Sequence, residues 1–157
     1  SSDLGLFIDG LDRDVNNKKA KYHDVKDVSG TYNYILFSQI LEHNVFDSMA
    51  AFVDFARRRG DYVLIGLPNG SNPFAATFFF NELTHVKNYD SDGFLHYLET
   101  CGLSVEAVYH TDLDLCFDNA WAFIRSLYRC VNVYLCGFSP FNCTVIVCRV
   151  LDGANDA

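Results

Sequence analysis

The sequence has no Gly-x-Gly anywhere in its 157 residues, and basic residues are few. The first absence excludes the phosphate-binding P-loop and the glycine-rich turn with which dinucleotide-binding folds approach phosphates. The second leaves 12 Lys and Arg against 20 Asp and Glu, a net charge of −8, with one short basic cluster at Arg57–Arg59. Because nucleic-acid binding needs an extended basic face, this composition argues against a nucleic-acid partner.

Long apolar runs, a secretory signal and paired metal-binding cysteines are missing as well. The apolar stretches break well short of the ~20 residues needed to span a bilayer. The first residues do not have the pattern of a signal peptide. None of the six cysteines forms a Cys-x-x-Cys pair, and several lie in apolar runs, which favours free thiols in a reducing compartment. We therefore expect a cytoplasmic protein with no membrane segment and no bound metal.

Strand-like and helix-like segments alternate along the chain. Half of the residues are apolar or aromatic, enough for one hydrophobic core in a chain of this length. Short apolar and β-branched runs predict strands at 4–9, 22–27, 32–37, 62–67, 103–109, 131–136 and 143–150. Apolar residues at helical spacing predict helices at 47–59, 91–101 and 119–128. We expect residues 1–157 to form a single domain.

This alternation predicts an α/β fold with an open, mostly parallel, twisted sheet. Helices would cover both of its faces, and 131–136 and 143–150 would form an antiparallel C-terminal hairpin. Ligands of such sheets bind at the carboxyl ends of the strands. Polar residues that follow a strand are therefore the first candidates for a functional site.

Three segments, in order and in register, carry a family resemblance. Residues 32–43 read YNYILFSQILEH, residues 60–69 read GDYVLIGLPN, and residues 85–108 read HVKNYDSDGFLHYLETCGLSVEAV. They resemble the fourth strand, the fifth strand and the following helix and strand of class I S-adenosylmethionine (SAM) dependent methyltransferases of the type 11/12 kind. The resemblance spans about residues 4–150. It implies a Rossmann-like sheet and SAM as cofactor.

The resemblance also implies a set of site residues. Asp9 falls where the family places an acid that binds the ribose hydroxyls, a task that suits a carboxylate because it accepts two hydrogen bonds. Asp24 falls where the family binds the adenine amine. The cofactor-binding candidates after the fourth strand are Ser38, Gln39 and Glu42, with Glu42 orienting the loop.

Two histidines are the candidates for a catalytic base. His43 follows the fourth strand, and His85 belongs to the segment that would wall the acceptor site. Oxygen and nitrogen acceptors sometimes need a base, whereas the transfer itself requires mainly alignment. Solvated turn acids and structural histidines are the alternative interpretation of these residues.

The sequence departs from the family at two points. The strand and glycine-rich turn that should come first are absent, so the fold is N-terminally incomplete or has lost its cofactor loop, and we expect no tight SAM binding. Asn33 also replaces the usual Asp. Two functions stay open: methyl transfer to a small molecule or glycan, and an inactive domain for protein interaction or regulation. An unrelated nucleotide-binding domain is disfavoured by the absence of a P-loop. We expect a protein partner, self-association or a rearranged amino terminus to cover the incomplete sheet edge.

Overall fold

The computed structural model describes residues 9–11, 16–70, 72, 84–87, 89, 91–113, 117–136 and 141–151. The chain divides into two compact units, Ser1–Thr31 and Tyr32–Ala157. Each unit is described by itself.

The described residues of the first unit form mainly turns and bends. Leu11 and Tyr22 form an isolated parallel bridge, and a single 3₁₀ turn follows at Val25–Asp27. The strand expected at 22–27 is therefore wrong beyond its first residue. The reason is local: the Asp24 carboxylate accepts a hydrogen bond from the backbone N–H of Lys26 at 2.9 Å, which stabilises a turn in place of an extended chain. Of the strand expected at 4–9, residues 4–8 lie outside the described residues.

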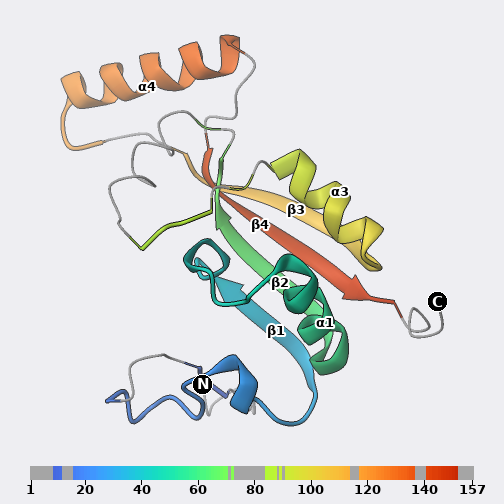
Figure 1. Ribbon diagram of the computed structural model, residues 1–157. Helices are drawn as coiled ribbons and strands as arrows, with labels where there is room; N and C mark the ends of the chain where they lie inside the picture. The colour runs from blue at the N-terminus through green and yellow to red at the C-terminus, as the bar shows by residue number, and fades with distance from the viewer. Residues whose placement is uncertain are drawn as a thin grey trace. The chain divides into compact units, whose positions relative to one another are not determined.

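The second unit contains an open four-stranded sheet in the order β1-β2-β4-β3 (Figure 1). Its strands are β1 (Tyr32–Ser38), β2 (Gly60–Pro68), β3 (Leu103–Leu113) and β4 (Phe141–Val150). β1 and β2 run parallel, whereas β4 is antiparallel to both β2 and β3. The predicted open α/β sheet is thus confirmed. Its antiparallel C-terminal pair is β3 with β4, not 131–136 with 143–150.

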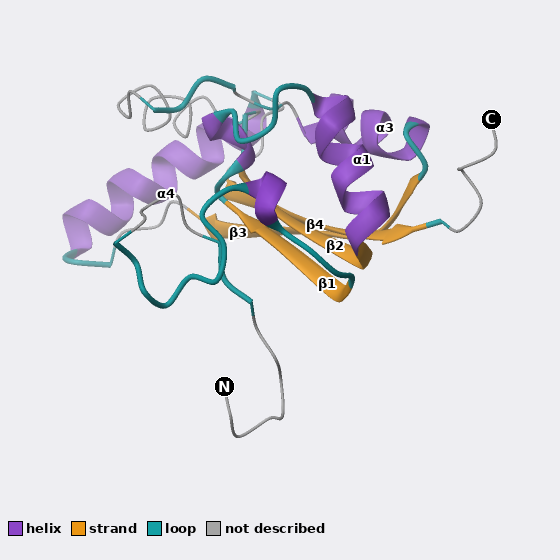
Figure 2. Ribbon diagram, turned by 60° about the horizontal axis from the view of Figure 1, so that its bottom comes forward, coloured by secondary structure: helices purple, strands orange, loops and turns teal. Residues whose placement is uncertain are grey.

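Helices α1 (Met49–Arg59) and α3 (Ser91–Thr100) cover one face of the sheet (Figure 2). Strand side chains alternate between faces, and the covered face carries Phe37, Ile65 and Ile146, which are aligned across neighbouring strands. All three are nearly or fully buried. Phe37 meets the ring of Phe52 on α1 edge-on, with 5.1 Å between centroids. The hydrophobic core therefore lies between this face and the two helices.

Helix α4 (Ala120–Leu135) corrects the strand expected at 131–136. Val131, Val133 and Tyr134 suggest a strand when taken alone, because β-branched and aromatic residues favour strands. The run 120–135 contains no glycine or proline, however, and Asn119 caps its start by accepting from the backbone N–H of Ala122 at 2.8 Å. Nothing in that run ends a helix, so the helix continues through residue 135.

Large apolar side chains stay exposed on the opposite side of the sheet and on α4. On the sheet these are Tyr34 (67% exposed), Leu36 (66%) and Tyr109 (58%). On α4 they are Trp121, Ile124, Leu127, Tyr128, Val131, Tyr134 and Leu135. Among the helices in the described part of the chain, none is long and apolar enough to cross a membrane.

Candidate functional site

The candidate site begins at the carboxyl end of β1. The chain leaves this strand at Ser38 and turns at Gln39, whose φ of 51° lies in the left-handed region. The backbone N–H of Gln39 donates to the carbonyl of Gly66 at 2.9 Å, which ties the turn to β2. Its side-chain Nε2 reaches the Sγ of Cys143 on β4 at 3.1 Å. The turn is thus anchored at the edge of the sheet where open α/β folds bind ligands.

A 3₁₀ turn at Leu41–His43 then presents two candidate residues side by side. Glu42 is fully buried, and its backbone carbonyl accepts from the N–H groups of Val86 at 2.9 Å and Lys87 at 3.3 Å. These two bonds hold the loop 84–87 against the turn. They explain why His85, far away in sequence, lies next to Glu42 and His43.

The two histidines are in ring contact. The centroids of His43 and His85 lie 4.6 Å apart with the rings tilted by 54°. The Nδ1 of His43 lies 3.3 Å from the carbonyl oxygen of Thr84. Because a carbonyl can only accept, this contact favours the neutral tautomer with the proton on Nδ1 and the lone pair on Nε2. The nitrogen that can accept a proton or bind a metal ion is therefore Nε2 of His43.

Tyr89 closes this part of the site from the following loop. Its hydroxyl donates to the carbonyl of Leu41 at 3.2 Å. Burial, and then the nearby charge of Glu42, raise the pKa of Tyr89 above its ordinary value of 10.0. The hydroxyl consequently stays protonated at neutral pH and remains a hydrogen-bond donor. Sequence analysis did not single out Tyr89, although it follows His85 by only four residues.

Two buried asparagines connect the end of β2 to the start of β4. The side-chain Nδ2 groups of Asn69 and Asn72 both donate to the carbonyl of Phe141, at 2.9 and 3.2 Å. Each asparagine is 1% exposed. Asn69 ends the Pro-Asn motif noted in the sequence, but its pairing with Phe141 joins positions 72 residues apart and could not be anticipated.

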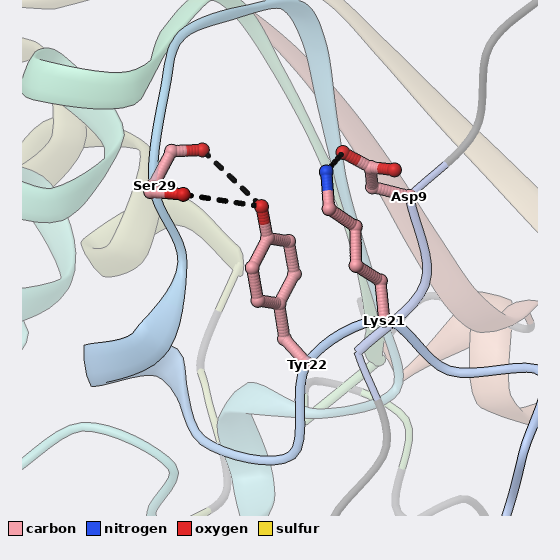
Figure 3. A network of polar contacts seen from close by, with 4 residues as sticks. All are labelled: Asp9, Lys21, Tyr22 and Ser29. Carbon is pink, nitrogen blue, oxygen red and sulfur yellow. Dashed lines mark hydrogen bonds and ion pairs between the residues drawn. The ribbon is translucent and has the colours of Figure 1, made fainter.

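The two remaining candidates, Asp9 and Asp24, belong to the first unit, and Figure 3 shows Asp9 with its partner Lys21. The Oδ2 of Asp9 pairs with the Nζ of Lys21 at 2.7 Å, and this pairing raises the pKa of the lysine. Lys21 also lies over the ring of Tyr22, whose hydroxyl contacts Ser29. A ribose hydroxyl would compete with the Lys21 ammonium for that oxygen. Asp24 acts as the cap of its 3₁₀ turn.

The structure therefore brings together the predicted residues of the second unit. In the first unit, Asp9 and Asp24 make different local contacts. Glu42, His43 and His85 form one cluster, in which one ligand atom from each lies within 4.8 Å of the others. Ser38 and Gln39 lie at the end of β1 directly before it. The roles assigned to these residues stay predictions.

Comparisons with known proteins identify the fold. No family model and no curated protein matches the sequence. Among solved structures, a SAM-dependent methyltransferase from Archaeoglobus fulgidus superposes with a TM-score of 0.66 at 17% identity, over 94% of this chain and 78% of that one. Magnesium protoporphyrin IX methyltransferase from Synechocystis, solved with bound SAH, reaches 0.49 at 9% identity, over 82% and 49% of the two chains. The first of these shows that the chain has the fold of class I SAM-dependent methyltransferases.

Proposed function

We propose that this chain is a SAM-dependent methyltransferase that methylates a small molecule or glycan. One observation carries the proposal: the fold of the Archaeoglobus fulgidus methyltransferase is combined with a carboxylate–histidine cluster after the carboxyl end of β1. The net charge of −8 favours an acceptor that is not a nucleic acid. The free thiols among the described cysteines support the expected cytoplasmic location, since they persist in a reducing compartment.

The cluster suits proton removal from an acceptor hydroxyl or amine. SAM supplies an electrophilic methyl group. Nε2 of His43 has the lone pair needed to take the acceptor's proton, because Nδ1 donates to Thr84. His85, in ring contact with His43, is the second candidate for the same task.

The residues fit the cofactor in part. In the first unit the Asp9 carboxylate, which would serve the ribose diol, is paired with Lys21. In the second unit the end of β1 lies at the edge where the fold class binds its ligand. The sequence supplies no glycine-rich turn for the other end of the cofactor. We therefore expect weak SAM binding.

The second candidate function is an inactive methyltransferase-like domain that binds a protein. Asn33 favours it, because its side chain donates to Asp61 Oδ2 at 3.1 Å and so has a structural task. Strand β1 lies at the edge of the described sheet and exposes Tyr34 and Leu36, which a partner chain or a second copy could cover.

Calorimetry with SAM and SAH on the full chain separates the two functions. The cofactor role of Asp9 predicts that Asp9→Ala lowers the affinity by roughly tenfold or more, the effect of losing one hydrogen bond to a charged group. Asp54→Ala is the matched control, because Asp54 also forms an exposed ion pair, with Arg58 on α1. Equal losses in both variants would reject the ribose role. No binding of SAM or SAH to the wild type would favour the inactive domain.

A further inference from the structure

A set of metal-ligating side chains converges where the sequence alone predicts no metal site. One ligand atom each of Glu42, His43 and His85 lies within 4.8 Å of the other two. The sequence gives no sign of this, since His85 is 42 residues away from His43 and no short ligand spacing joins them. The cluster exists because the Glu42 carbonyl binds the N–H groups of the loop that carries His85.

The orientation of His43 is that of a metal ligand. Histidines that bind metals usually donate their other ring N–H to a backbone carbonyl or carboxylate, which fixes the tautomer and aims the free lone pair. Nδ1 of His43 makes such a contact with the Thr84 carbonyl at 3.3 Å, and the lone pair is then on Nε2. The imidazole is thereby held in the form that a cation requires.

Charge favours a cation at this point. Glu42 is fully buried, and a buried carboxylate is stabilised by a cation bound to it. A divalent cation held by Glu42 would offset the cost of burying that carboxylate.

We propose that Glu42, His43 and His85 bind a divalent transition-metal cation such as Zn²⁺. Two imidazoles and one carboxylate suit zinc and its first-row neighbours, whereas Mg²⁺ and Ca²⁺ prefer oxygen ligands alone. Ligand atoms at about 2.1 Å from a tetrahedral zinc lie roughly 3.4 Å apart, so modest side-chain rotations close the site. Three protein ligands leave a coordination position for water or for an oxygen of another molecule.

This inference goes beyond methyl transfer and does not require it. A cation bound to His43 and His85 would occupy the lone pairs that the two candidate bases need, so the metal role and the base role exclude each other. Methyl transfer itself requires mainly alignment and does not depend on either role. Metal binding is measured on its own, without SAM. Its failure would leave the methyltransferase proposal standing, and failure of SAM binding would leave the metal site standing.

The test is a titration of the metal-depleted full chain with Co²⁺, followed by visible absorption, and then with Zn²⁺ as competitor. We expect one Co²⁺ per chain, with d–d bands of low-coordinate cobalt that Zn²⁺ abolishes. His85→Gln and Glu42→Gln should each weaken binding at least a hundredfold, because even loss of a group that merely supports a ligand costs about 10–100-fold. Zn²⁺ should raise the Tm of the wild type and not that of His85→Gln.

Two control variants test whether the loss of Co²⁺ binding is specific to the proposed ligands. His96→Ala removes an exposed histidine from α3, and Cys136→Ser removes an exposed thiol, so both should bind Co²⁺ as the wild type does. Circular dichroism identifies any variant that fails to fold, and His85→Gln, which alters only a loop residue, decides the case if Glu42→Gln unfolds. Equal weakening by His96→Ala, an intense thiolate-to-cobalt charge-transfer band, or no binding at millimolar Co²⁺ would overturn the proposal.

Discussion

The buried amide of Asn69 gives a residue-scale prediction. Its Nδ2 donates to the Phe141 carbonyl at 2.9 Å with the side chain 1% exposed. Asn69→Asp replaces this donor with an oxygen that faces the carbonyl, and we expect the free energy of unfolding to fall by about 1–3 kcal/mol at pH 7. Urea unfolding measures the change.

The matched control is Asn33→Asp, which makes the same replacement on the surface. Asn33 is exposed and donates to Asp61. Water screens the two carboxylates that the variant brings together, so its cost should stay below about 1 kcal/mol. Equal costs for the two substitutions would mean that the Asn69 amide does not hold β4 as described.

Cysteine reactivity provides a second test at this scale. Cys148 is fully buried on β4, and burial, followed by the charge of Glu99, raises its pKa to about 12. Cys136 is exposed after α4. Since the thiolate is the nucleophile, iodoacetamide at pH 8 should label Cys136 readily and Cys148 only in denaturant. Peptide mass spectrometry measures both rates in one sample, and similar native rates would contradict this packing.

At the scale of elements, sequence patterns located most helices and strands but misjudged those decided by distant or capping contacts. The strand expected at 32–37 appears as β1, and the one expected at 62–67 lies within β2, because their apolar β-branched runs are buried by the same sheet. The run 131–136 looked the same locally, yet it ends a helix that Asn119 begins twelve residues earlier.

Local sequence patterns also predict the candidate site only in part. His43 and Glu42 could be singled out because they belong to a segment that resembles a family motif and lie shortly after a predicted strand, where open sheets bind ligands. Their contact with His85 depends on backbone bonds from Val86 and Lys87 to Glu42. No local pattern reports such a bond, so the three residues could be proposed separately but not as a cluster.

The solvent exposure of helix α4 can be tested by the fluorescence of the single tryptophan. Trp121 is 68% exposed on the apolar side of this helix. We expect its fluorescence to peak near the wavelength of free N-acetyltryptophanamide and to be quenched by acrylamide almost as strongly. Urea unfolding should shift the peak little. A blue-shifted, protected emission in dilute solution would mean that another surface covers α4.

For the whole molecule, net charge and exposed apolar surface have opposite effects on self-association. At pH 7 the net charge of −8 keeps copies apart, although the sheet exposes Tyr34 and Leu36 at its β1 edge. The charge vanishes near the isoelectric point of about 4.9. Because an exposed apolar edge strand is a template for pairing, we expect self-association to increase between pH 7 and pH 5.

Light scattering of two lysine variants distinguishes self-association through the β1 edge from self-association caused by the loss of net charge. Leu36→Lys adds a cation to the exposed edge, where charged side chains prevent strand pairing, and Thr100→Lys adds the same charge at the exposed end of α3. If copies of the chain associate through β1, the Leu36→Lys variant remains monomeric at pH 5, whereas Thr100→Lys associates like the wild type. Equal behaviour of the two variants would assign the association to net charge. A wild type that remains monomeric at pH 5 would show that copies of this chain do not cover the edge, which leaves a different protein as the partner to seek.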